Sequence, residues 1–281
     1  MILSVKHSEL LTKREITLRI ESGARSFSEQ DTNSLFIELK KTHSDISKST
    51  FDTLINSSHI PTYHPIKDFF DNNRDKITSG HIEKLCSSVK SSMDSEFKMA
   101  LITKWLVGMV ASIYDGNYNP LMLILIGGKN IGKTEFFRRL LPTELKDYFA
   151  QSKFDSGKDS EALMCEKLII LNDELDALNK KEAKTFRNFI SADNYTYRPP
   201  YGKQNVTKKR LATICGTSNE RQIINDWENN RRIIPIEIDN IDHFLYNSIN
   251  KSYLILEALN LFKKGYKWDL TSHEIDLLGK H

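Results

Sequence analysis

The sequence has few cysteines, no apolar run of membrane-spanning length and almost no net charge. Its 281 residues include three cysteines, Cys86, Cys165 and Cys215, scattered without metal-ligand spacing. This pattern argues against a disulfide framework or a cysteine-based zinc site, and we expect buried, reduced thiols. Because no run approaches the ~20 apolar residues that cross a bilayer, we expect a cytoplasmic protein with no membrane partner.

The formal net charge of +3 does not by itself indicate a nucleic-acid partner, so the local distribution of charge must decide that question. Hydrophobic residues make up 39% of the chain and aromatic residues 10%. This composition supports a packed core and excludes a disordered protein. The length suits one large domain or two smaller ones. No internal repeat and no long low-complexity segment is present.

The most informative segment begins with Leu121–Ile126, a continuous apolar run typical of a buried strand. It leads into the pattern G-x-x-x-x-G-K-T and then into a helical run, Glu135–Leu141. Glycines let successive backbone amides converge on one point, and the start of the helix adds partial positive charge. We therefore predict a phosphate-binding loop for a nucleoside triphosphate, formed by Gly127, Gly128, Lys129, Asn130, Ile131, Gly132, Lys133 and Thr134.

Within this loop, Lys133 can reach the outer phosphates and the Thr134 hydroxyl can ligate Mg²⁺. A second buried strand, Leu168–Asn172, ends in the adjacent carboxylates Asp173 and Glu174. We expect this strand to neighbour the first, with its acids facing the phosphates. Asp173 is assigned to the metal and Glu174 to the attacking water. The alternative is that the two acids simply begin a turn before a helix.

Two further strand ends carry polar residues of interest. Leu211–Thr217 is followed by Asn219, whose amide can orient a water beside the γ-phosphate or, alternatively, cap the next segment. Arg231 and Arg232 directly precede the strand Ile233–Ile238. An arginine delivered to the γ-phosphate of a neighbouring subunit raises hydrolysis by orders of magnitude. The alternative is a solvated basic pair or a salt bridge.

A basic segment, residues 195–210, reads YTYRPPYGKQNVTKKR and contains five basic residues, three tyrosines and no acid. Pro199, Pro200 and Gly202 indicate a turn, so we predict a protruding hairpin. Cations can pair with phosphates while aromatic rings contact bases or sugars. The alternative is a solvated surface loop. The candidate contacts to single-stranded DNA are Tyr201, Lys203, Lys208 and Lys209.

Strands and helices alternate after Asn119, which predicts an α/β fold with a largely parallel sheet. Residues 1–115 look helical and polar and are expected to form a small N-terminal domain for oligomerisation or linking. Within them, Met99–Tyr114 carries apolar residues at helical spacing, which we interpret as core packing. Residues 116–240 would form the ATPase core, and residues 241–281 a helical tail.

Together these segments resemble the helicase domain of the virulence-associated protein E family, a branch of the superfamily 3 helicases within the AAA+ clade of P-loop NTPases. The resemblance runs from about His64 to Leu278. It is most specific between residues 157 and 238, where GKDSEAL, NDELDALNKKEAKTFRNFIS, YRPPYGK, CGTSN and NNRRIIPIEI occur in the family's order.

The resemblance implies a role for each candidate. Lys133 and Thr134 would belong to Walker A, Asp173 and Glu174 to Walker B, and Asn219 would be the sensor. Arg232, or alternatively Arg231, would act across a subunit interface, and Lys203 would grip the strand from a pore loop. The cofactors implied are ATP and Mg²⁺. Such proteins form homo-oligomeric rings, commonly hexamers, that move along single-stranded DNA.

The same resemblance implies a function in the replication of a phage or mobile genetic element, with a primase or an origin-binding protein as a further partner. Residues 1–60 show no catalytic acid cluster of a primase, which many relatives carry upstream. From the ordered motifs we expect an ATP-dependent DNA helicase. Two alternatives stay open. One is a DNA-associated ATPase, a loader or regulator, that does not unwind. The other is a nucleotide-gated oligomeric scaffold, against which the basic, acid-free hairpin argues.

Overall fold

The computed structural model describes residues 2–8, 10, 14–18, 24–26, 28–76, 78–114, 118–152, 158–175, 185–186, 188–198, 204–220 and 232–279. The chain folds into two compact units, Met1–Phe69 and Phe70–His281. The boundary expected near residue 115 falls inside the second unit, between a helix and the first strand of its main sheet. The division of roles among the three expected segments stays a prediction.

The second unit is built on a five-stranded sheet in the order β12-β6-β11-β8-β7, with every neighbouring pair parallel. This confirms the α/β fold with a parallel sheet. The strands are β6 (Met122–Ile126), β7 (Phe149–Gln151), β8 (Ile169–Asn172), β11 (Thr213–Ser218) and β12 (Ile233–Glu237). All residues of β6, β8 and β11 are buried, as expected for central strands of a parallel sheet.

One expectation about this sheet is wrong. The strand that ends in Asp173 does not neighbour the phosphate-loop strand, because β11 lies between β6 and β8 and pairs with both. The order of strands along a chain does not fix their order in a parallel sheet, since every parallel connection is a crossover. The carboxyl ends of all three strands nevertheless lie at one edge, with Ser218 opposite Ile126 and Gly216 opposite Asn172.

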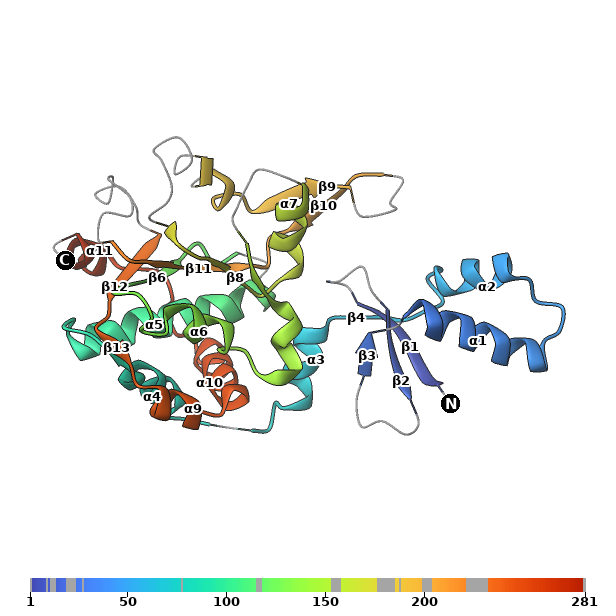
Figure 1. Cartoon of the computed structure of the whole chain (residues 1–281), viewed down its shortest axis with the longest axis horizontal. Helices are drawn as coiled ribbons and strands as arrows, with labels where there is room; N and C mark the ends of the chain where they lie inside the picture. Colours follow the sequence, from blue (N-terminus) through green and yellow to red (C-terminus); the bar gives the residue numbers. More distant parts are fainter. Residues whose placement is uncertain are drawn as a thin grey trace. The chain divides into compact units, whose positions relative to one another are not determined.

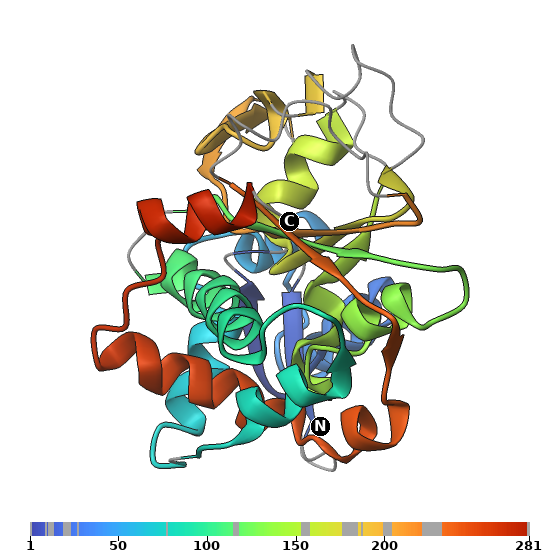
Figure 2. The ribbon, with the colours of Figure 1, turned by 90° about the vertical axis from the view of Figure 1, so that its left-hand side faces the viewer.

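Helices and a hairpin cover the two faces of the sheet (Figures 1 and 2). On one face lie α7 (Lys158–Glu166) and the hairpin of β9 (Asn194–Tyr197) and β10 (Val206–Lys209). On the other lie α5 (Ser95–Tyr114), α6 (Lys133–Arg138) and α10 (Lys251–Lys263). The expectation that the apolar stripe of Met99–Tyr114 is core is confirmed, because α5 is buried along most of its length.

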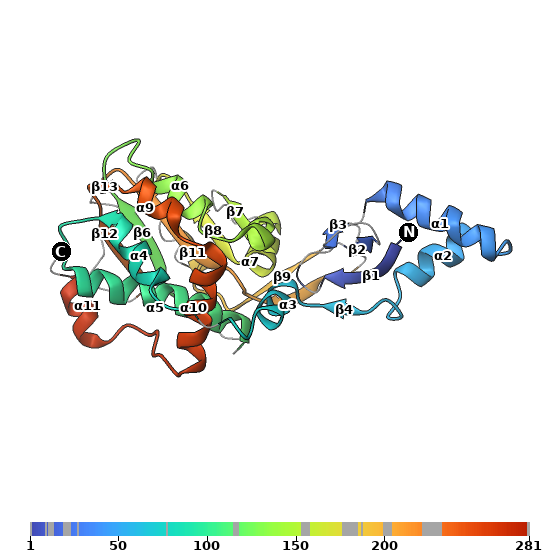
Figure 3. The ribbon, with the colours of Figure 1, turned by 90° about the horizontal axis from the view of Figure 1, so that it is seen from below.

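Shorter elements complete this unit (Figure 3): α4 (His81–Ser88), β5 (Val89–Lys90), η1 (Thr143–Tyr148), β13 (Asn240–Ile241), α9 (His243–Ser248) and α11 (Ser272–Leu278). α11 begins with a capping box between Thr271 and Glu274. Glu274 also pairs with Lys104 of α5 at 2.6 Å. Because both side chains are largely buried, this pair fixes the C-terminal helix to the core helix.

The first unit contains a four-stranded sheet in the order β3-β2-β1-β4, from β1 (Ile2–Ser8), β2 (Arg14–Leu18), β3 (Ala24–Ser26) and β4 (Thr62–Tyr63). The expected helices are present from residue 29 on, as α1 (Glu29–Thr42) and α2 (Lys48–Ile55), with α3 (Pro65–Asn72) across the unit boundary. Residues 2–8, 14–18 and 24–26 instead form strands. The sequence signal for the second of these is the alternation of Ile16 and Leu18 with polar residues.

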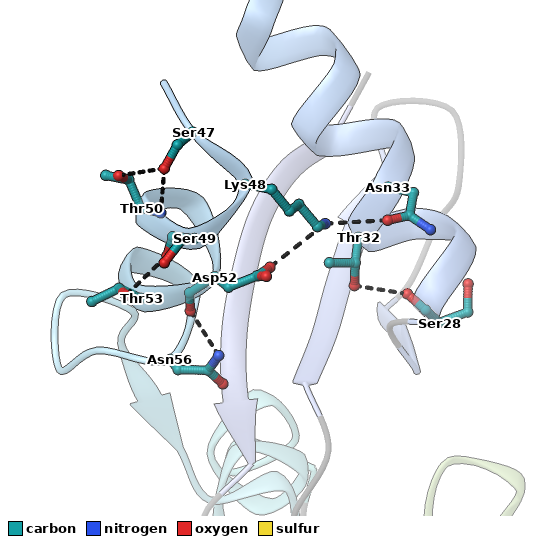
Figure 4. Close-up of polar contacts among 10 residues, drawn as sticks. All are labelled: Ser28, Thr32, Asn33, Ser47, Lys48, Ser49, Thr50, Asp52, Thr53 and Asn56. Atoms are coloured by element: carbon teal, nitrogen blue, oxygen red, sulfur yellow. Dashed lines mark hydrogen bonds and ion pairs between the residues drawn. The ribbon is translucent and has the colours of Figure 1, made fainter. Parts of the chain in front are cut away.

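Lys48 joins the two helices of this unit (Figure 4). Its ammonium nitrogen lies 3.1 Å from Oδ1 of Asn33 in α1 and 3.5 Å from a carboxylate oxygen of Asp52 in α2. It also lies over the rings of Phe36 and Phe51, 5.0 and 4.9 Å from their centroids. Cation–π contacts of this kind stabilise an otherwise polar helix pair by about 0.5–1 kcal/mol each.

Candidate functional site

The predicted phosphate loop lies between β6 and α6, at the carboxyl end of the sheet. Asn130 and Gly132 have left-handed backbones, with φ of 62° and 91°. This conformation, which favours glycine, turns the chain back sharply before α6. The Lys133 ammonium folds over the loop and donates to the carbonyl oxygens of Gly127 and Gly128, both at 2.6 Å. These two hydrogen bonds of Lys133 therefore hold the two ends of the loop together.

The polar residues predicted on the separate strands converge on this loop. Lys133 Nζ lies 3.2 Å from Oδ1 of Asn219, which follows β11. The Thr134 hydroxyl lies 3.1 and 3.2 Å from the two carboxylate oxygens of Asp173, which follows β8. Thr217, in β11, also donates to Asp173. A hydroxyl and a carboxylate at this separation provide two oxygen ligands of the kind that Mg²⁺ takes in nucleotide sites.

Glu174 has an unusual backbone. Its φ of 57° lies in the left-handed region, which is uncommon for a residue with a side chain. The backbone N–H of Glu174 donates to the Thr217 hydroxyl at 3.2 Å, which helps to hold this conformation, and the side chain is exposed. Strain of this kind concentrates at functional sites, where neighbouring contacts offset its cost of about 1–3 kcal/mol.

Among the contributors to the site that were not predicted from the sequence, two lie outside the phosphate loop and orient Asp173. Gln151, at the end of β7, donates from its amide nitrogen to Asp173 at 3.0 Å. Arg138, in α6, donates to the amide oxygen of Gln151 at 3.0 Å and pairs with Glu135. This chain of contacts orients the Asp173 carboxylate from the outer side of the sheet. The three-residue strand β7 has no sequence signal strong enough to reveal it.

The phosphate loop and the polar residues after β8 and β11 line one cavity of about 520 Å³, within the ~300–1,000 Å³ typical of small-molecule sites. It is lined by Lys129, Asn130, Ile131, Gly132, Lys133, Thr134, Glu135, Asp173, Glu174, Thr217, Asn219 and His243. Among the described residues, no three His, Cys, Asp or Glu side chains gather as a metal cage. A nucleotide-bound Mg²⁺ needs no such cage, because phosphate oxygens and water complete its shell. The donor set therefore fits Mg²⁺ with a nucleoside triphosphate.

The arginine proposed for a neighbouring site lies elsewhere. Arg232 immediately precedes β12, at the amino-terminal edge of the sheet, and its carbonyl oxygen accepts from the Met122 N–H at 2.6 Å. Its guanidinium donates to the Ser191 hydroxyl and lines a second cavity, of about 870 Å³. Arg232 is thus separated from its own phosphate loop by the length of β6. Arg231 lies outside the described residues.

The predicted hairpin is confirmed by the antiparallel pairing of β9 and β10, with Tyr197 opposite Val206. Its interpretation needs one correction, however. Tyr195 and Tyr197 are 5% and 2% exposed and belong to the core under the sheet, so they cannot contact bases. Because side chains alternate along a strand, Lys208 is half-buried and Lys209 is exposed. Tyr201 and Lys203 lie outside the described residues.

Arg210, also counted among the basic residues of the hairpin, is 2% exposed and structural. Its guanidinium donates to the carbonyls of Ala212 at 2.8 Å, Asn119 at 3.3 Å and Ile190. It also stacks on Tyr118 at 4.7 Å. Burial lowers the pKa of Arg210 to about 10, so the group remains charged at neutral pH. Arg210 joins the base of the hairpin to the sheet and is not available to DNA.

The three cysteines are free and buried, as expected. Burial raises the pKa of Cys86 and of Cys165 to about 12, which makes both poor nucleophiles. Within the described residues, α5 is long and apolar enough to cross a membrane, but 78% of its most apolar window is buried inside the protein. It is therefore the core helix of its unit.

Comparison with known proteins places this geometry in a family. No curated protein matches the sequence significantly. A solved structure described as the A form apo structure of the NrS-1 C terminal region is 16% identical, with a TM-score of 0.60 over 98% of this chain and 71% of that chain. A second apo structure of that region, residues 305–718, is 15% identical, with a TM-score of 0.59 over the same shares. These similarities show a common fold.

The sequence model of the Virulence-associated protein E-like domain matches residues 73–281, which is most of the chain and includes every residue of the phosphate-loop cavity. The match begins close to the start of the second compact unit. The family relationship expected from the ordered motifs is confirmed. This chain belongs to the Virulence-associated protein E-like domain family.

Proposed function

We propose that this chain is an ATP-dependent DNA helicase of the superfamily 3 type that acts in the replication of a phage or another mobile genetic element in the cytoplasm. The observation that carries the proposal is the convergence of Lys133, Thr134, Asp173, Glu174 and Asn219 on one cavity. These residues come from three strand ends, yet each has the chemistry that one step of phosphoryl transfer needs.

Each side chain has a distinct task in this proposal. Lys133, now bonded to loop carbonyls, would exchange those bonds for the outer phosphate oxygens of ATP. Thr134 and Asp173 would hold Mg²⁺, which neutralises the charge that develops on the phosphates. Glu174 would accept a proton from the attacking water, and Asn219 would orient that water. The exposed position of Glu174 leaves its carboxylate able to turn toward the phosphates.

The position of Arg232 supports a homo-oligomer, which we propose to be a hexameric ring. A residue at the amino-terminal edge of the sheet is remote from its own phosphate loop but can face the loop of a neighbouring copy. Arg232, or Arg231 beside it in the sequence, would stabilise the transition-state charge there. The site would then be complete only between two subunits.

Single-stranded DNA is the proposed partner of the hairpin, through Tyr201, Lys203, Lys208 and Lys209. A primase or an origin-binding protein would supply loading or site selection. The exposure of Lys209 and the partial exposure of Lys208 support contacts to phosphates, which need no base recognition.

A strand-displacement assay with forked DNA and ATP tests the proposal, with Lys133→Ala as the inactive control. We expect displacement by the wild-type protein only. Hydrolysis that is stimulated by DNA but displaces no strand would favour the loader or regulator. No hydrolysis at all, with correctly folded protein, would reject the ATPase assignment.

A further inference from the structure

His243 lines the phosphate-loop cavity, although no motif in the sequence points to it. Its ring packs directly against the loop glycine Gly132. A β-carbon placed on Gly132 would lie 2.5 Å from Cε1 and 2.7 Å from Nε2 of His243, far inside van der Waals contact. The histidine therefore forms one wall of the cavity, and a glycine is needed at position 132 for this contact as well as for its φ of 91°.

Two contacts of α9 fix the position of His243, one before the helix and one within it. Asp242 caps the helix by accepting from the Leu245 N–H at 3.0 Å. Tyr246, which is buried, donates from its hydroxyl to the Phe136 carbonyl of α6 at 2.5 Å. Figure 3 shows α9 close to α6, the helix that the phosphate loop begins. A side chain held in this way is preorganised for a ligand in the cavity.

The order of strands decides which part of a nucleotide His243 faces. Asp173 and Asn219 follow β8 and β11, on one side of the phosphate-loop strand β6. His243 begins α9, after β12 and the short strand β13, and β12 lies on the other side of β6. With the metal and water ligands at Asp173 and Asn219, the phosphates and Mg²⁺ of a bound nucleotide would lie on that side of β6. The remainder of the nucleotide would then extend toward His243.

We propose that His243 binds the nucleoside half, the ribose and base, of the nucleotide in this cavity. This inference rests on the proposed function, because it presumes that the cavity binds ATP. A neutral imidazole offers one donor and one acceptor, which match the hydroxyls of a ribose, and its flat ring can pack against a base. The exposed ring of His243 can make these contacts without displacing a neighbour.

Direct binding measurements on the intact 281-residue chain test this assignment, with ATP, ADP and inorganic tripolyphosphate as the three probes. His243→Ala should weaken ATP and ADP equally, by about fivefold to tenfold, the loss of one or two ordinary contacts. Tripolyphosphate, which has no nucleoside, should bind the variant as tightly as it binds the wild type. His243→Gln, which keeps a donor and an acceptor, should recover part of the loss.

Phe244→Ala is the matched control, because Phe244 is adjacent on α9, is 90% exposed and does not line the cavity. It should leave all three affinities unchanged. Wild-type affinity of His243→Ala for ATP would overturn the assignment, and so would an equal loss of tripolyphosphate affinity, which would place His243 on the phosphates. If Lys133→Ala also bound ATP and tripolyphosphate normally, the proposed function itself would fail, which is a separate result.

Discussion

The side chains of Thr134 and Asp173 are in contact although 39 positions separate them in the chain. Thr134 lies in the first turn of α6, whereas Asp173 follows β8, two strands away from β6 in the sheet. The gap between β6 and β8 is filled by β11, and Thr217 of that strand donates to the same carboxylate. Residues of α6 and β11 thus position the carboxylate of Asp173, the candidate metal ligand at the end of β8.

This arrangement predicts different defects for the two adjacent acids. Asp173→Asn should raise the Mg²⁺ concentration for half-maximal ATP turnover by at least about tenfold, because an amide is a weaker ligand for a hard cation. Glu174→Gln should bind ATP normally and hydrolyse it about a hundredfold more slowly, because an amide cannot accept the proton of water. Phosphate release at several Mg²⁺ concentrations measures both. Normal turnover by Glu174→Gln beside an inactive Asp173→Asn would reverse the two roles.

Lys133→Ala should abolish ATP turnover and leave the fold intact. The ammonium of Lys133 is mostly buried and bonds three oxygens of the loop and of Asn219, so its removal takes away the charge nearest to the phosphates. Phosphate release measures turnover, and circular dichroism with a thermal melt checks folding. Turnover within about twofold of the wild type would reject the phosphate loop as the site.

Mixing two inactive variants tests whether Arg232 acts between subunits. Arg232→Ala and Lys133→Ala should each be inactive alone, but mixed rings contain some interfaces that pair an intact loop with an intact arginine. Partial turnover should therefore return, and sedimentation confirms that the rings are mixed. The contact of Arg232 with Ser191 offers a control, since Ser191→Ala removes that contact and keeps the arginine. If mixed rings form but show no activity, Arg232 does not act in the neighbouring site, and Arg231 should be tested in the same way.

Lys203→Ala and Lys209→Ala should each lose DNA-stimulated turnover while keeping basal hydrolysis. The hairpin covers one face of the sheet, whereas the phosphate loop lies at the carboxyl edge, so the two sites are separate. Each lysine that contacts a phosphate should lower the slope of DNA affinity against salt by about one unit. Fluorescence anisotropy at several salt concentrations measures the slope. Unchanged slopes for both variants would favour a solvated loop.

Lys251 should contribute a stability that rises with pH above neutrality. Burial, and secondarily the nearby Arg139, lower the pKa of Lys251 from 10.5 to about 8. Its ammonium lies over the Tyr246 ring at 3.7 Å and donates to the Tyr246 carbonyl at 2.6 Å. Between these two pKa values Lys251 binds more protons in the unfolded chain than in the folded chain, so its contribution to the free energy of unfolding increases with pH. The buried cysteines, whose pKa values are raised by burial, act in the opposite direction, so the effect of Lys251 is measured as a difference between variants.

Thermal melts from about pH 7 to about pH 9.5 measure this effect, below the range in which tyrosines ionise in the unfolded chain. The difference in free energy of unfolding between the wild type and Lys251→Met should increase as the pH rises, while Lys263→Met, at an exposed position on the same helix, should keep the slope of the wild type. The same slope in the wild type and in Lys251→Met would assign the pH dependence to other groups.

The sequence predicts the central sheet well because its strands are short, continuous apolar runs between polar ends. Leu121–Ile126 and Leu168–Asn172 each lie within one residue of the observed strand. Their carboxyl ends carry the catalytic candidates, so the site follows once the strands are known to be parallel. The position of β11 between them could not be predicted, because it depends on which crossover packs best and not on any local pattern.

The features that the sequence does not reveal depend on contacts between distant segments. His243 is a lone histidine, and only the return of the chain after β12 brings it to Gly132. Tyr195 and Tyr197 look like surface aromatics beside basic residues, yet the alternation of β9 turns both into the core. Gln151 reaches Asp173 only because β7 lies at the edge of the sheet beside β8.

The burial of Arg210 has a mechanical consequence. A hairpin that pulls on a polymer needs a stiff root, or the force is lost in bending the hairpin itself. One planar guanidinium ties that root to the segment before β6, to the segment before β9 and to the entry of β11. Tension applied at the hairpin would thus reach the two central strands whose far ends carry the phosphate loop and Asn219. Arg210→Met would roughly keep the volume of the side chain and remove these three hydrogen bonds. The hairpin would then be attached less rigidly to the sheet.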